Sequence, residues 1–155
     1  MEKREDLLQY VEGDRGISVI RGGGGENRAW NGILYKTGLS GKNVRATGLS
    51  MNVATVPPGA IAYAHIHDGF EVMLFILEGR VRHDYGSDLR YSVENEAGDF
   101  IYIEPGVPHE VFNIGEGPLR AVVARSAADE WDRIIDYPSR YRPSVQEKGA
   151  QETLS

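Results

Sequence analysis

The sequence predicts an all-β fold, a sandwich or a barrel, and three observations lead to this prediction. From residue 43 onward the chain consists of short segments rich in β-branched, aromatic and small residues. Turns containing glycine or proline separate these segments at short intervals, as in PPGA at 57–60. The length of 155 residues suits one domain with a proper core, and no internal repeat is visible. We therefore expect residues 1–155 to form a single domain.

The composition argues against several classes of function. Lys and Arg number 17 against 23 Asp and Glu, and the net charge of −6 disfavours nucleic acid or an anionic membrane as a partner. Cysteine is absent, which excludes disulfides, thiolate metal sites and cysteine nucleophiles. The N-terminal stretch MEKREDLLQYVEGDRG has no apolar signal core, and no run approaches membrane-spanning length. We therefore expect a cytoplasmic protein that binds neither nucleic acid nor a membrane.

Before residue 43 the sequence predicts little regular structure. Residues 1–12 can form a short helix, because Leu7, Leu8 and Val11 share one helical face. Residues 21–32, RGGGGENRAWNG, are expected to be a loop, since the glycines at 22–25 do not hold a regular element without a large entropic cost. A phosphate-binding loop would need a following Gly-Lys-Ser/Thr and a helix start, and neither is present. We interpret the glycine run as a connector.

The expected strands follow one another from residue 43 to residue 125. They are NVRATGLSMNVATV, AYAHIH, EVMLFILEG, VRHDYG, LRYSVEN, a pair within EAGDFIYIEPGVPHEVFN, and PLRAVVARS. EGR at 78–80 reverses the chain between the third and the fourth segment. The following stretch, SAADEWDRIIDYPSRYRP, is expected to contain one or two helical turns. Residues 144–155 are polar and are expected to form a disordered tail.

Two histidines stand just before the most apolar segment. His65 and His67 are two residues apart in a predicted strand, so both imidazoles project to one face and can occupy two neighbouring positions on one metal ion. His109 offers a third imidazole, and Glu71 shares the odd parity of the pair. Such N and O ligands suit Fe(II), Mn, Ni, Zn or Cu. A histidine pair alone is equally compatible with ordinary surface or hydrogen-bonded residues, so both interpretations stay open.

The orientation of Glu71 depends on Asp68 and Gly69. If the strand is continuous, the Glu71 carboxylate faces the histidines. Coordination of a metal ion would then remove the free-energy cost of burying this carboxylate unpaired. A turn or bulge at Asp68–Gly69 would free Glu71 to be either a ligand or the exposed edge of the strand. The same parity would place three apolar side chains in the cavity, with one phenol at its edge: Met73, Phe75, Leu77 and Tyr63.

Two further residues have alternative readings. Tyr63 is a candidate catalytic residue if its phenol reaches the cavity, and otherwise a core or rim tyrosine. His83 follows the EGR turn without a spaced partner. We expect His83 to have a structural or supporting role rather than that of a metal ligand.

Two motifs in the sequence resemble those of the cupin family, a small β-barrel of the jelly-roll type. The first motif comprises Gly59, His65, His67, Glu71 and Gly79. The second comprises Gly98, Gly106, His109 and Asn113, with Glu104 where the family has proline. The resemblance spans about residues 44–125 and implies a double-stranded β-helix, with His65, His67, Glu71 and His109 binding one divalent metal ion per chain. The family motif has six residues between its carboxylate and its last glycine, whereas seven residues separate Glu71 from Gly79. If the motif is counted back from Gly79, the carboxylate position falls on Val72.

The resemblance implies a metal-binding protein that acts on a small molecule, but no single reaction, because this fold carries many chemistries. We expect a metal-dependent enzyme with dioxygenase-like or related isomerase, decarboxylase or lyase chemistry. The alternative is a non-catalytic cupin that binds or senses a metal or a small molecule. No Arg or Lys is spaced next to the expected ligands, so no particular acidic substrate is indicated. We also expect a homodimer, because VMLFIL is apolar on both strand faces.

Overall fold

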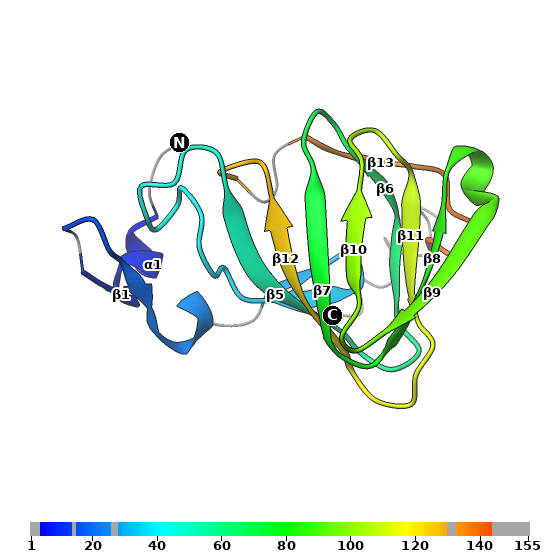
Figure 1. Ribbon diagram of the computed structural model, residues 1–155, viewed down its shortest axis with the longest axis horizontal. Helices are drawn as coiled ribbons and strands as arrows, with labels where there is room; N and C mark the ends of the chain where they lie inside the picture. The colour runs from blue at the N-terminus through cyan, green and yellow to red at the C-terminus, as the bar shows by residue number, and fades with distance from the viewer. Residues whose placement is uncertain (1–3, 14, 26–27, 130–132, 144–155) are drawn as a thin grey trace.

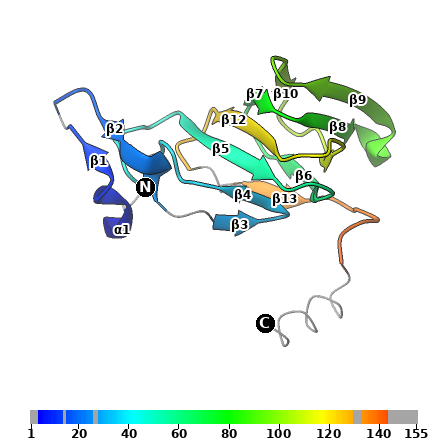
Figure 2. The ribbon, with the colours of Figure 1, turned by 90° about the horizontal axis from the view of Figure 1, so that it is seen from below.

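Two antiparallel sheets face each other and form a barrel in this computed structural model, which describes residues 4–13, 15–25, 28–129 and 133–143 (Figure 1, Figure 2). The described part is mostly strand with very little helix, which confirms the predicted all-β fold. It holds no helix with the length and apolar character needed to cross a bilayer.

One sheet has six strands in the order β10-β7-β12-β5-β4-β3. Its strands are β3 (Arg28–Trp30), β4 (Ile33–Tyr35), β5 (Ser50–Val56), β7 (Val72–Glu78), β10 (Phe100–Ile103) and β12 (Leu119–Arg125). The other sheet has five strands in the order β13-β6-β11-β8-β9. Its strands are β6 (Ile61–His67), β8 (Arg80–Tyr85), β9 (Tyr91–Glu96), β11 (His109–Asn113) and β13 (Ile134–Asp136).

The N-terminal elements lie at one end of the molecule, away from β8 and β9 (Figure 1). They are helix α1 (Glu5–Leu8), the hairpin of β1 (Val11–Glu12) and β2 (Val19–Ile20), and the 3-10 turn η1 (Arg21–Gly24). A second 3-10 turn, η2 (Ser87–Leu89), links β8 to β9. Helix α1 confirms a short N-terminal helix, and it buries Leu7. The helix is shorter than the range 1–12 considered for it, because Val11 and Glu12 form β1 instead of the shared helical face with Leu7 and Leu8.

The alternation of β7 is opposite to the one predicted. Val72 and Ile76 are buried, whereas Met73 is 56% exposed and Leu77 is 41% exposed on the outer face. The expectation that Met73, Phe75 and Leu77 line the cavity was therefore wrong. The physical reason is that β6 and β7 belong to different sheets. The chain crosses between the sheets at Gly69, whose φ of 79° breaks the strand, so parity is not carried from one strand to the next.

The barrel interior holds two apolar clusters. One consists of Val56, Ile76, Val81, Leu119 and Ala121, and the other of Phe70, Val72, Ile103, Val123 and Ala127. Gly79 closes the turn from β7 to β8 with a φ of 94°, and a Cβ there would lie 2.7 Å from the Pro118 carbonyl oxygen. Glycine is therefore required where the two sheets meet at this end of the barrel.

Two further segments differ from the sequence prediction. Residues 28–30, expected within a loop, form β3, which pairs with β4 through a two-residue connection of Asn31 and Gly32, both at positive φ. Asn-Gly is a strong signal for such a hairpin, and it lies in a stretch that the glycine run had marked as a loop. Towards the C-terminus, the described residues 133–143 contain strand β13 rather than helical turns, and the predicted tail at 144–155 lies outside the described residues. β13 pairs with β6 in the register Ile134↔His67 and Asp136↔His65.

Candidate metal centre

The structure brings together the three histidines that the sequence singled out. His65 and His67 end β6, and His109 begins β11, where it pairs directly with His65. All three are at most 5% exposed. One potential ligand atom from each ring lies within 4.8 Å of those from the other two. This spacing allows the three imidazoles to bind one ion.

Hydrogen bonds to main-chain carbonyls fix the orientation of two of these rings. The Nδ1 atom of His65 lies 2.7 Å from the Tyr63 carbonyl oxygen, and Nδ1 of His109 lies 2.9 Å from that of Val107. A carbonyl oxygen can only accept, so each Nδ1 carries the proton and each Nε2 keeps its lone pair. Metal-binding histidines in proteins are commonly held in this way. The donor set thus fits a divalent metal ion on the chemistry of the residues present.

Burial keeps the three imidazoles neutral. It is the main cause that lowers the pKa of His65 to about 3 and that of His67 to about 2, and the charge of His109 adds to both effects. Burial also lowers the pKa of His109 itself. Near neutral pH the rings are therefore unprotonated, which is the state that binds a metal.

The structure does not bring Glu71 to this cluster. Its side chain is exposed and accepts a hydrogen bond from the Tyr102 hydroxyl at 2.7 Å. The change of sheet after Gly69 turns Val72 rather than Glu71 into the barrel, which agrees with the count back from Gly79. The geometry corresponds to the exposed edge of the strand and gives no support to Glu71 as a fourth ligand.

Tyr63 contributes its carbonyl oxygen to the site, and its phenol is not among the side chains that line the cavity. The carbonyl also accepts a hydrogen bond from the Asn31 side-chain amide at 2.7 Å. Pairing between β6 and β11 shifts register between Ala62 and His65, so alternation is broken at Tyr63. The same parity as His65 therefore does not bring the Tyr63 phenol to the histidines.

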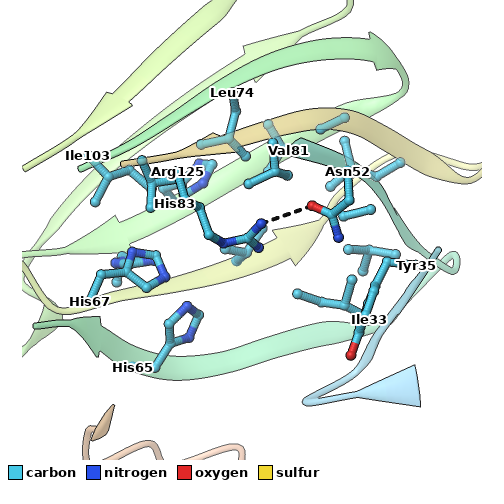
Figure 3. A pocket seen from close by; sticks show the side chains of 18 of the residues that line it. Ile33, Tyr35, Asn52, His65, His67, Leu74, Val81, His83, Ile103 and Arg125 are labelled. Atoms are coloured by element: carbon cyan, nitrogen blue, oxygen red, sulfur yellow. Dashed lines mark hydrogen bonds between the residues drawn. The ribbon is translucent and has the colours of Figure 1, made fainter. Parts of the chain in front are cut away.

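The fourth histidine faces the same cavity. His83 is 3% exposed and points into the barrel interior from β8 (Figure 3). Neither of its ring nitrogens has a hydrogen-bond partner among the described residues. Burial, followed by the charge of His109, lowers its pKa to about 3. Buried polar groups are normally paired, so an unpaired imidazole facing a cavity is typical of a group that contacts a ligand or ordered water.

The histidines form one end of a cavity of about 80 Å³ between the two sheets. Much of its wall is aliphatic, with contributions from Val56, Leu74, Ile76, Val81, Ile103, Leu119 and Val123. Trp30 from β3 also lines it, with its ring 5.5 Å from that of His65. An apolar wall with a few convergent polar groups is the usual character of a small-molecule site.

Sequence reasoning missed two polar residues of this cavity, Asn52 and Arg125. The Arg125 guanidinium donates a hydrogen bond to the Asn52 side-chain oxygen at 2.9 Å (Figure 3). A signal was present in the strand itself, because Leu119, Ala121 and Val123 form the buried face of β12 and Arg125 has the same parity. The contact with Asn52 depends on the pairing of β12 with β5 (Val123↔Asn52), which the sequence does not reveal.

Sequence comparisons relate the central part of the chain to a known protein family. Residues 52–125 match the family described as Cupin domain. A curated relative, the uncharacterized protein MJ1618 of Methanocaldococcus jannaschii, is 38% identical over 71 residues. The match covers 46% of this chain and 54% of the relative, so the chain spans about half the length of that relative.

Solved structures of similar fold include a cupin domain. The cupin domain of Cnp3 from Schizosaccharomyces pombe has a TM-score of 0.60 at 11% identity, covering 72% of this chain and 77% of the other. A predicted oxalate decarboxylase from Thermotoga maritima has a TM-score of 0.61 at 19% identity, covering 70% of this chain and 98% of the other. These likenesses establish the jelly-roll fold and leave the activity of this chain open.

Proposed function

We propose that this chain, whose residues 52–125 match the family described as Cupin domain, is a metal-dependent enzyme acting on a small organic molecule. In this proposal His65, His67 and His109 hold one divalent metal ion, and the substrate occupies the barrel cavity beside it. The reaction would be dioxygenase-like or a related decarboxylation, isomerisation or lyase step. The likeness to a predicted oxalate decarboxylase supports this range without selecting one member.

One observation carries the proposal: three buried, neutral imidazoles converge, and main-chain carbonyls orient two of them. A buried imidazole nitrogen without a partner is unfavourable, and Nδ1 of His67 has none among the described residues, so this arrangement is best explained by a bound ion. A set of three nitrogen donors suits Fe(II), Mn, Ni, Zn or Cu. When bound, the ion would supply a Lewis acid that binds substrate oxygen atoms and stabilises negative charge on them.

The remaining residues of the cavity have roles that follow from their positions. The aliphatic wall excludes water and so strengthens electrostatic interactions inside the cavity. His83, with both ring nitrogens unpaired among the described residues, can exchange a hydrogen bond or a proton with the bound molecule. Only three protein ligands are assigned, so positions on the ion stay open for substrate.

Metal binding is tested by reconstitution of the chelator-treated protein and measurement of metal content. We expect close to one equivalent per chain for the wild type, and a strong loss for His65→Ala, for His67→Ala and for the double variant. His83→Gln is the matched control, because His83 is buried like the ligands but lies outside their cluster. Full metal occupancy in the His65→Ala/His67→Ala double variant would refute the proposed site.

Turnover separates an enzyme from a binding or sensing protein. The metal-loaded protein is incubated with diketones, catechols and 2-oxo acids, and dioxygen uptake and product formation are followed. We expect metal-dependent turnover of at least one class, abolished in the double variant. Saturable binding of these compounds without any turnover would favour the non-catalytic function instead.

We also propose a homodimer formed through the outer face of the six-stranded sheet. This face exposes several large apolar side chains: Leu34, Met51, Met73, Leu77, Phe100 and Tyr102. Contiguous apolar surface on a protein commonly marks an interaction site, and two-fold symmetric dimers are the commonest assembly. The apolar run VMLFIL then has one face in the barrel and the other against the partner.

A further inference from the structure

We infer that the cleft between β9 and β10 is an outer part of the substrate site, and that the substrate carries an uncharged apolar group about the size of an aromatic ring, which this cleft holds. The inference rests on the proposed metal site, because the oxygen-bearing end of the same molecule would contact the ion. It gives the substrate a second part that the barrel cavity is too small to hold.

The cleft arises where the chain changes sheet after β9. A short turn at 97–99 joins β9 to β10, and the Asp99 amide donates a hydrogen bond to the Glu96 carbonyl oxygen at 3.1 Å. The two strands are edge strands of different sheets, so no ladder joins them in the described part of the chain. Figure 1 shows them separating from this turn. The barrel is therefore open on this side, and a cleft of about 420 Å³ lies there.

The cleft adjoins the candidate metal centre. Three residues line both the cleft and the barrel cavity: His83, Ile103 and His109. His109 is one of the proposed ligands, so a molecule in the cleft lies next to the position of the ion. His83 is 3% exposed, and both of its ring nitrogens are unpaired among the described residues. A neutral imidazole offers one donor and one acceptor, so a polar group of a molecule that spans the two spaces would satisfy it.

The volumes of the two spaces indicate a ligand larger than the barrel cavity alone can hold. Pockets that bind small molecules commonly measure about 300–1,000 Å³. The barrel cavity of about 80 Å³ lies well below this range, whereas the cleft of about 420 Å³ lies within it. The two adjoining spaces thus suit a molecule whose metal-binding end enters the barrel while its larger part stays in the cleft.

The lining of the cleft favours an uncharged apolar group. Three strands, β8, β9 and β10, contribute its apolar side chains: Tyr85, Val93, Ile101 and Ile103. None of the described lining residues is a lysine or an arginine, and the carboxylate of Glu104 is exposed to solvent. An anionic group therefore finds no cationic side chain here, whereas an aromatic or aliphatic group gains free energy by leaving water for this surface.

The test uses the zinc-loaded chain of residues 1–155 and isothermal titration calorimetry with acetohydroxamate and benzohydroxamate. Both probes chelate zinc through the same pair of oxygen atoms, and they differ only in carrying a methyl or a phenyl group. Val93→Trp fills the cleft, and Tyr85→Ala removes part of its wall. Ser92→Trp is the matched control, because Ser92 is exposed on the same strand and its side chain points to the opposite face. Zinc affinity is measured for each protein by competition with a chelator.

We expect wild type to bind benzohydroxamate at least tenfold more tightly than acetohydroxamate, because the phenyl ring leaves water for the cleft. Val93→Trp should remove this preference while keeping its zinc, Tyr85→Ala should reduce it, and Ser92→Trp should behave as wild type. Tyr85→Ala decides the same question if Val93→Trp does not fold.

Two kinds of failure are distinguishable. If wild type binds zinc but binds both hydroxamates equally, or binds neither, the inference is wrong although the metal site stands. The same conclusion follows if the cleft variants keep the full preference for benzohydroxamate. If wild type binds no zinc, the proposed function itself fails.

Discussion

Acidification should unfold the metal-free protein well above the pH at which its carboxylates titrate. The perturbation is a change from about pH 7 to about pH 5 in the presence of a chelator. The pKa values of His65, His67 and His83 are lowered to about 3, about 2 and about 3, whereas an unfolded chain has histidines near 6.5. Between these limits the unfolded state binds more protons than the folded state, so stability is fully present above about pH 6.5 and falls as the pH falls towards about 3.

The magnitude follows from the width of that window. For each histidine that stays neutral in the folded state, the free energy of unfolding falls by about 1.4 kcal/mol per pH unit below the unfolded pKa. At pH 5 this loss is about 2 kcal/mol for each histidine. Three such histidines give about 6 kcal/mol, which is comparable with the entire free energy of unfolding of an ordinary domain. His109, whose pKa burial also lowers, acts in the same direction.

The assay is urea denaturation at both pH values, followed by tryptophan fluorescence. The His83→Leu variant should lose about 2 kcal/mol of the pH dependence, because it removes one of the four buried imidazoles. Zinc should restore stability at the lower pH, since it binds only the neutral rings and only in the folded state. A difference below about 1 kcal/mol between the two pH values would refute the reasoning, because the histidines would then be protonated in the folded protein.

Three further outcomes are expected. Glu71→Gln should leave the zinc affinity unchanged while His67→Gln lowers it more than about tenfold, and an equal loss in chelator competition would restore Glu71 as a ligand. Phe100, which is 80% exposed, should lie in the dimer interface, so Phe100→Glu should give a monomer mass by light scattering. Tyr91→Glu, which changes an exposed residue in the other sheet, should keep the dimer mass. Gly79→Ala should lower the free energy of unfolding by more than about 1 kcal/mol, and by more than Gly98→Ala does. Both glycines have positive φ, but only a Cβ at Gly79 would meet neighbouring backbone. Equal losses of stability in the two variants would contradict the role of that contact.

The parts of the site that depend on local geometry were predictable from the sequence. Residues two apart on one strand share a face, which correctly paired His65 with His67, and the motif around His109 brought in the third imidazole. The same rule misplaced Met73 and Leu77, because it holds only within a continuous strand and the chain changes sheet after Gly69. Parity is thus reliable only within an unbroken stretch of strand: it fails at Tyr63, where the register of β6 shifts, and again beyond the turn at Gly69.

The residues that could not be predicted are those brought in by pairing between distant segments. Arg125 and Asn52 meet because β12 lies beside β5, and no spacing along the chain encodes that contact. His83 faces the cavity because β8 lies beside β11, with His83 opposite Val111. Trp30 reaches His65 from a segment whose glycines had marked it as a loop. Each of these contacts requires knowledge of which strands are neighbours.

The pairing of β13 with β6 has a consequence for the solubility of shortened chains. β6 carries His65 and His67, and β13 satisfies the main-chain groups on one of its sides. The segment after β13 adds further contacts, since the Arg142 guanidinium donates to the Ala64 carbonyl oxygen at 2.6 Å. A chain cut before residue 133 would turn β6 into a free edge strand, and unprotected edges recruit strands from other molecules. Aggregation of such a truncated protein would then begin at the strand that holds the histidines.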